Sequence, residues 1–200
     1  VLENFTGIIA GSKTSGTVKA ENWVKYILNS ESTLRLFAQL HTYSIETNDW
    51  LTGAKEDSEQ EFSFPDFITL QGHLEAESLH HTNTYITNLS ADIKYVPRTL
   101  TLTKTRFNSF SGDLGVNLVM RQNKSSFSYD VNLQTKNVNL QKMLEAYSNF
   151  GQTAVTDTHI RGVLNCGLDI SFESNFCRSM TSVSVEDTLS ELNRVLLNLR

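Results

Sequence analysis

The chain has 200 residues, of which 39% are hydrophobic and 20% are charged, with only two prolines and a net charge of −5. This composition is typical of a folded domain and excludes a disordered chain, while the scarcity of proline favours long, unbroken strands. The negative charge leaves no basic stripe for phosphates, so nucleic acid is excluded as a partner.

The ends of the sequence predict a piece of a larger protein. Val1 is not an initiator methionine, and the sequence stops at Arg200 inside a helical pattern. We therefore expect a targeting or membrane-anchoring segment in flanking sequence. Residues 1–200 are treated as one segment with three stretches: strand and helix repeats over 1–64, an antiparallel meander over 65–138, and a helix, a hairpin and a terminal amphipathic helix over 139–200.

Short helices after strand ends recur along the sequence. A β-branched residue at a strand end is followed, five and six residues later, by apolar residues, loosely so in the last case: Val18 by Trp23 and Val24, Ile45 by Trp50 and Leu51, Val138 by Met143 and Leu144, and Val183 by Leu189. Such residues let a helix fold back over the open end of a sheet. The alternative is a set of unrelated loops. Helices are predicted near 21–29, 140–147 and 185–199.

Four segments in the middle of the chain alternate apolar and polar residues, which is typical of antiparallel strands with one apolar face. They are residues 68–76, 85–95, 114–120 and 127–133. A further strand, 160–172, shows the same alternation, although two glycines interrupt it. The predicted fold class is mainly β, an antiparallel meander with a few short helices at strand ends.

Hairpin registers can be predicted because residues paired across a hairpin share a face. The last hairpin of the meander is expected to place Met120 opposite Phe127. A prolyl turn is expected to pair Tyr95 with Leu100. Around residues 108–109, the two apolar faces match only with a three-residue loop or a bulge.

Four stretches of the sequence resemble the C-terminal region of AsmA-like proteins, in the version found in Bacteroidota. They are TVKAENWVKYIL, SFPDFITLQGHLEAESL, RFNSFSGDLGVNLVM with its Gly112, and VNLQKMLEAYSNFGQTAVTDTHIRGVLNCGLDISF. The resemblance is one of hydrophobicity and turn residues, and residues 178–200 depart from it. It implies a long, curved sheet that forms a groove or trough, in a periplasmic protein that is anchored to the inner membrane and carries lipid toward the outer membrane.

The resemblance implies that the inward side chains line a path for acyl chains. At about 0.8 kcal/mol per methylene, transfer of an acyl chain of ~16 carbons into water costs roughly 10 kcal/mol of free energy. A path lined by apolar side chains removes most of that barrier. A core covered by helices would alternate in the same way, but the predicted helices are too short to cover so many strands. The expected lining residues are Ile68, Leu70, Leu89, Ile93, Leu114, Val116, Leu118, Phe127, Tyr129, Val131, Leu164 and Leu168.

Residues with other chemistry form no motif in the sequence. His41, His73, His80 and His81 lack the spacing of zinc ligands and are expected on the surface. No nucleophile elbow, phosphate-binding glycine loop or HExxH motif occurs. Cys166 and Cys177 flank a predicted turn out of register, so we expect two unbridged thiols. No metal and no cofactor are predicted.

These expectations lead to a non-catalytic groove that binds or transports phospholipid or another acyl lipid, in the periplasm and attached to the inner membrane through a segment outside these residues. The alternative is a structural or adhesive β-sandwich of a cell-surface protein, in which two sheets bury each other's apolar faces. An enzyme on a β scaffold is less favoured, because it needs convergent polar groups in a pocket.

Overall fold

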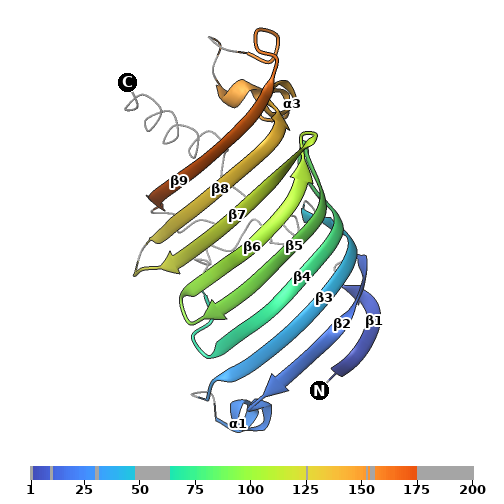
Figure 1. The fold of residues 1–200 in the computed structure, drawn as a ribbon. Coiled ribbons are helices and arrows are strands. Elements are labelled where there is room, and N and C mark those ends of the chain that lie inside the picture. Colours follow the sequence, from blue (N-terminus) through green and yellow to red (C-terminus); the bar gives the residue numbers. More distant parts are fainter. Residues whose placement is uncertain are drawn as a thin grey trace, which may run out of the picture.

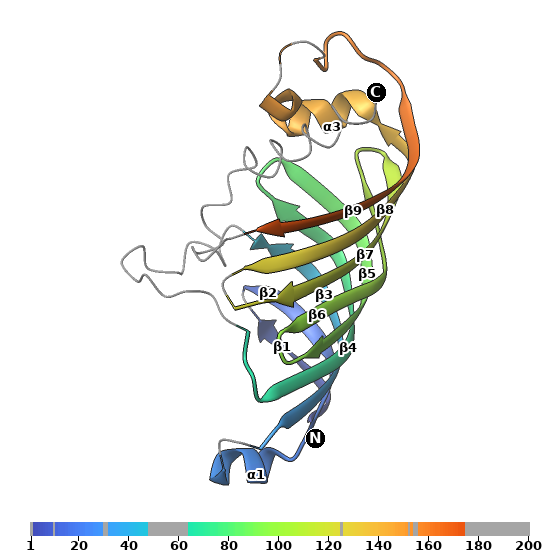
Figure 2. The same cartoon turned by 90° about the vertical axis from the view of Figure 1, so that its left-hand side faces the viewer.

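A computed structural model describes residues 2–9, 11–29, 32–47, 64–124, 126–151, 153 and 156–174 of the chain. They form one open sheet of nine strands, which lie side by side in chain order from β1 to β9 (Figure 1). Seen from the side, the strands curve in one direction and the sheet forms a trough (Figure 2). The prediction of a mainly β fold, with a long, curved antiparallel sheet and short helices at strand ends, is confirmed, apart from one parallel pair of strands.

Most strands have ten or more residues, as the near absence of proline predicts. Their bounds are β1 (Leu2–Ile9), β2 (Ser12–Glu21), β3 (Leu34–Glu46), β4 (Ile68–His81), β5 (Thr84–Val96), β6 (Thr99–Ser109), β7 (Gly112–Gln122), β8 (Phe127–Asn139) and β9 (Val163–Ser174). Strands β4 to β8 form the predicted meander, because each pairs antiparallel with the next.

Two of the predicted helices follow strand ends. Helix α1 (Trp23–Leu28) comes directly after β2, and helix α3 (Leu140–Ala146) comes directly after β8 and leads into a short 3-10 turn, η1 (Ser148–Gly151). The side chain of Asn139 caps α3 by accepting a hydrogen bond from the Lys142 N–H. The other two repeats, at Trp50 with Leu51 and at Val183 with Leu189, lie outside the described residues, as does the predicted terminal helix.

Strands β3 and β4 run parallel, which the sequence did not predict. A parallel pair requires the chain to return along the sheet before it enters the second strand. The end of this return, residues 64–67, is described, and the Leu34 N–H donates to the Phe67 carbonyl over 2.8 Å. The Phe64 ring contacts the rings of Tyr95 and Phe127. The connection therefore reaches β4 along the face that carries those two rings.

The β5–β6 register follows the sequence prediction, whereas the β6–β7 turn lies two residues beyond its predicted position at residues 108–109. Tyr95 lies opposite Leu100. The β6–β7 turn consists of Phe110 and Ser111, both with positive φ, and the predicted irregularity is a bulge between Leu102 and Thr105.

The predicted register of the β7–β8 hairpin is wrong by two residues. Met120 lies opposite Tyr129, and Phe127 lies opposite Gln122. The ladder continues further toward the turn than predicted, and the Asn123 N–H donates to the Ser126 carbonyl to close a short loop. Both registers pair apolar side chains, and a shift of two residues leaves every side chain on the same face.

Bulges in the middle of the strands accompany the curvature of the sheet. Asn88 in β5, Lys104 in β6 and Asn137 in β8 have φ values of 54°, 52° and 57°, and the register shifts beside each of them. An extra residue on one strand bends it and increases its twist. Asparagine is among the few residues that adopt such φ values at low cost. The bulges therefore help to turn a flat sheet into a trough.

Gly112 allows β7 and β8 to approach closely, which generates a stability prediction. A Cβ at Gly112 would lie 2.5 Å from the Val138 backbone nitrogen, whereas a Cβ at Gly115 in the same strand meets nothing closer than 3.9 Å. Gly112→Ala should lower the free energy of unfolding by ~1–3 kcal/mol, because the β8 backbone must move. Gly115→Ala, the matched control, should change it by less than about 0.5 kcal/mol. Denaturant unfolding followed by circular dichroism measures both, and equal effects would contradict the close approach.

Candidate functional site

The candidate site is the apolar face of the sheet, on which the registers align side chains into rows. One row runs across eight strands from β2 to β9 and consists of Ala20, Leu36, Leu70, Tyr95, Leu100, Met120, Tyr129 and Phe172. The next row contains only aliphatic side chains and one glycine, and consists of Val18, Ala38, Gly72, Ile93, Leu102, Leu118, Val131 and Ile170. A continuous apolar stripe therefore crosses the sheet at right angles to the strands.

All of the predicted lining residues lie on this one face. They are Ile68 and Leu70 of β4, Leu89 and Ile93 of β5, Leu114, Val116 and Leu118 of β7, Phe127, Tyr129 and Val131 of β8, and Leu164 and Leu168 of β9. Phe127 is buried, and the others are partly buried. Strands β2, β3 and β6 contribute further residues to this face that were not predicted, although the alternation in LRLFAQL and TLTL predicts the same face.

The apolar face is the concave side of the trough. The described residues contain one sheet, and both of their helices lie at strand ends rather than over its middle (Figure 2). Helix α3 projects to the concave side at one end, and the segment that leads into β4 passes on the same side (Figure 2). Val138, at 0% exposure, is the largest fully buried side chain of the described residues. Within this part of the chain, most side chains of the two rows are partly exposed, although Tyr95 and Met120 are buried.

Aromatic side chains cover one edge of the apolar face, where β5 and β7 end and β8 begins. The Phe64 ring lies 5.4 Å from the Tyr95 ring and 5.7 Å from the Phe127 ring, measured between centroids. The Phe64 N–H donates to the Gln122 side-chain oxygen over 2.7 Å, and the Tyr95 hydroxyl donates to the Pro65 carbonyl. These contacts hold the incoming segment against the sheet.

A second aromatic group covers the opposite edge, beside α3. The Tyr147 ring lies 5.9 Å from the Phe110 ring and 5.5 Å from the Phe150 ring. The Thr84 hydroxyl donates to the Tyr147 hydroxyl oxygen over 3.3 Å, and Leu144 of α3 is buried. The apolar rows are thus bordered by aromatic side chains at both ends of the strands. No signal in the sequence predicts either border, because each depends on contacts between distant segments.

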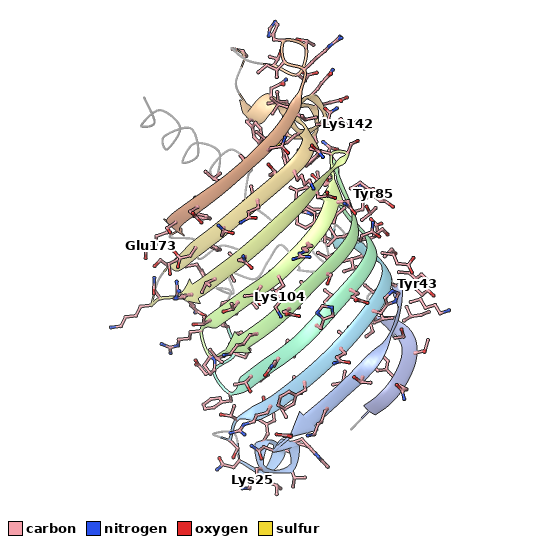
Figure 3. The ribbon with its side chains drawn as sticks, viewed as in Figure 1. Lys25, Tyr43, Tyr85, Lys104, Lys142 and Glu173 are labelled. Carbon is pink, nitrogen blue, oxygen red and sulfur yellow. The ribbon has the colours of Figure 1, made fainter. Side chains whose placement is uncertain are left out.

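The opposite, convex face is polar and carries ion pairs and hydrogen bonds between strands (Figure 3). Asp130 pairs with Arg121 and accepts a hydrogen bond from Ser171 over 2.8 Å. Hydrogen bonding to Arg121 holds the pKa of the Asp130 carboxyl below its ordinary value. The Asn132 side-chain amide donates a hydrogen bond to Asp169 Oδ1 over 2.7 Å. The two faces of the sheet therefore differ in chemistry along its whole width.

The histidines of the described strands lie on this polar face or at its edge, as predicted. His80 Nδ1 lies 3.1 Å from Glu46, His41 Nε2 lies 3.8 Å from Glu77, and His81 Nδ1 lies 2.6 Å from the Thr47 hydroxyl. Among the described residues, no three metal-ligating side chains come together. Cys166 is an exposed free thiol on β9, and Cys177 lies outside the described residues.

Three side chains on the polar face have the order of a catalytic triad. His73 Nδ1 lies 2.7 Å from Asp92 Oδ1, and its Nε2 lies 3.4 Å from the Ser90 hydroxyl. Acyl transfer also needs N–H donors for the oxyanion, and the backbone N–H groups of an interior strand lie in the plane of the sheet. Asp92 is also paired with Lys104 at 3.0 Å, and hydrogen bonds from His73 and Lys104 lower its pKa. The arrangement fits a hydrogen-bonded ladder better than a reaction centre.

A shallow hollow of about 760 Å³ lies on the same polar face, over β1 to β6. Its lining includes Lys19, Phe37, Gln71, Asp92 and Lys94. Charged groups of both signs make this hollow unsuitable for an acyl chain, since a chain placed there would remain against water and ions. The apolar trough is therefore the better candidate site, although it is open rather than enclosed.

Tyr129 offers a pH test of burial in the apolar row. Its ring stacks on Phe172 at 4.6 Å, and burial raises the pKa of its phenol. A raised pKa in the folded state stabilises the fold below the unfolded value of about 10, and this stabilisation is lost as the pH rises through the folded pKa. Tyr129→Phe should therefore flatten the alkaline fall of the unfolding free energy. Tyr85, 60% exposed on the polar face, is the matched position, and equal flattening in Tyr85→Phe would contradict the role of burial.

No family model, no curated protein and no solved structure matches the chain. Among the helices of the described residues, none combines the length and the hydropathy that a membrane span requires. The surface of the chain itself carries the candidate site, which is an apolar trough that crosses eight strands, with an aromatic border at each edge and a polar outer face.

Proposed function

We propose that the trough binds the acyl chains of a phospholipid or another acyl lipid without catalysing a reaction, and shields them from water. The observation that carries this proposal is the pair of apolar rows, which run from β2 to β9 and whose only polar side-chain groups are the hydroxyls of Tyr95 and Tyr129. The resemblance to AsmA-like proteins adds the setting: a periplasmic segment, attached to the inner membrane through sequence outside these residues, that passes lipid between the inner and outer membranes.

The dimensions of the rows suit an acyl chain. Neighbouring strands lie about 4.8 Å apart, so a row that crosses from β2 to β9 is roughly 34 Å long. The hydrocarbon core of a bilayer, which holds two acyl chains end to end, is about 30 Å thick. A single chain laid along the rows would therefore keep its whole length on apolar side chains, and each buried methylene contributes about 0.8 kcal/mol.

A structural or adhesive β-sandwich is the alternative. In a sandwich the apolar rows would pack against a second sheet about 10 Å away. The described residues form one sheet, so the second sheet would have to come from elsewhere. The groove is favoured because most side chains of the rows are partly exposed and lie on the concave side, whereas a sandwich buries them fully.

Photo-crosslinking can distinguish the two faces at paired positions. Leu118 lies opposite Val131 on the apolar face, and their neighbours Asn117 and Asn132 lie opposite each other on the polar face. Crosslinkers at Leu118 and Val131 should capture phospholipid in the purified protein, and crosslinkers at Asn117 and Asn132 should not. Mass spectrometry of the adducts measures the difference, and equal labelling of the four positions would argue against the groove.

A charge placed in the trough should prevent lipid binding. Leu118→Glu puts a carboxylate among the apolar rows, where an unpaired charge costs several kcal/mol once a lipid covers it. The lipid that co-purifies should fall by at least about tenfold. Asn117→Glu, the control, adds the same charge on the polar face and should leave the lipid content unchanged. Circular dichroism checks that both variants fold, and a folded Leu118→Glu protein with its full lipid content would sink the proposal.

A further inference from the structure

Helix α1 exposes an unusual share of apolar side chain for a short helix. Trp23 is 54% exposed, Val24 48%, Ile27 71% and Leu28 81%, and none of its residues is buried. Large apolar side chains that gather on one exposed element mark an interaction site more often than scattered ones do. These four residues form the α1 patch.

Helix α3 provides an internal comparison for α1. In both cases a strand valine is followed by an apolar pair five and six residues later: Val18 by Trp23 and Val24, and Val138 by Met143 and Leu144. In α3 the pair packs inward, and Leu144 is only 5% exposed. In α1 the corresponding side chains are about half exposed. The same sequence pattern is thus followed by a buried side chain at α3 and by half-exposed side chains at α1.

The location of α1 connects it to the trough. It follows β2, whose Val18 and Ala20 belong to the apolar rows. In Figures 1 and 2, α1 lies at the β1 end of the trough and α3 lies at the β9 end. A surface bound by α1 would therefore lie next to the place where the apolar rows end.

The composition of α1 fits a lipid surface. Its sequence, WVKYIL, contains Trp, Tyr and Lys together with three aliphatic residues and no acidic residue. Trp and Tyr favour the boundary between headgroups and acyl chains, and a lysine can extend its ammonium group toward the headgroups. A stable protein interface needs about 800 Å² from each partner, more than the side chains of a six-residue helix present. Shallow insertion into a bilayer needs only a few apolar side chains.

The helix also lacks the features that would stabilise it alone. Its N-cap residue, Asn22, has a left-handed φ of 63°, and its side chain makes no capping hydrogen bond. Six residues are too few for a stable isolated helix in water. Burial of the α1 patch in a lipid surface would supply the missing stabilisation.

We infer that the α1 patch inserts into the surface of a lipid bilayer and holds the β1 end of the trough against the membrane. The inference rests on the proposed function and names a partner for one end of the groove. Lipid could then pass from the bilayer to the apolar rows without crossing open water.

Tryptophan fluorescence tests the insertion in the full chain. The sequence has two tryptophans, so Trp50→Phe leaves Trp23 as the only reporter. With vesicles of phosphatidylethanolamine and phosphatidylglycerol, the Trp23 emission should shift to shorter wavelength, and lipids brominated near the headgroup should quench it. An unchanged spectrum with added vesicles would overturn the inference.

Variants separate the α1 patch from general hydrophobicity. The double variant Ile27→Gln with Leu28→Gln should weaken vesicle binding by more than about tenfold, because it removes the two most exposed side chains of the patch. Ile8→Gln is the control, since Ile8 is 78% exposed on β1 outside the patch, and it should bind vesicles as the parent chain does. Equal binding by the double variant and the control would contradict the inference, as would a dimer that the double variant abolishes.

The two proposals fail in different ways. Vesicle binding that persists in a protein without co-purified lipid would contradict the groove and leave the α1 patch supported. Lipid that still co-purifies with a chain that ignores vesicles would contradict the α1 patch alone. Flotation with vesicles and lipid mass spectrometry on the same preparations provide both measurements.

Discussion

The structure depends on one constraint: each strand must keep its apolar side chains on the same side as those of its neighbours. A shift by one residue anywhere would move a strand's apolar set to the polar face. Curvature threatens this agreement, because each bulge adds a residue and changes the alternation. In β5 the apolar side passes from Ile86 to Leu89, and in β8 it passes from Thr135 to Val138. The alternation resumes after each bulge, so the sheet bends without mixing its faces.

The two faces stabilise the sheet by different means. Hydrogen bonds and ion pairs such as Asp130 with Arg121 link neighbouring strands on the convex face. Exposed pairs of this kind contribute little individually, because water screens them. The concave face offers far more free energy through burial of its apolar rows, but only when something covers them. A ligand that binds only the folded state would therefore raise the stability of the whole sheet.

The sequence predicted the faces better than it predicted the pairing. Alternation alone identified the apolar sides of β4, β5, β7, β8 and β9, because period two is a local property. The β7–β8 register was wrong because Met120 finds an apolar partner at Phe127 and at Tyr129 alike, and only the loop decides between them. The parallel pairing of β3 with β4 has no local signal. The aromatic borders at Phe64 and Tyr147 arise from contacts between distant segments, so the site could be predicted as a surface but not as a bounded trough.

The parallel pair has a consequence for the folding of the sheet. Strands β4 to β8 are joined by tight turns, so each can add to the last through contacts close in sequence. Pairing β3 with β4 instead requires closure of a connection that spans residues 47–67, and closing a longer loop costs more entropy. Non-local pairings of this kind slow folding. The β3–β4 pairing therefore carries a larger entropic cost of loop closure than any turn within the meander.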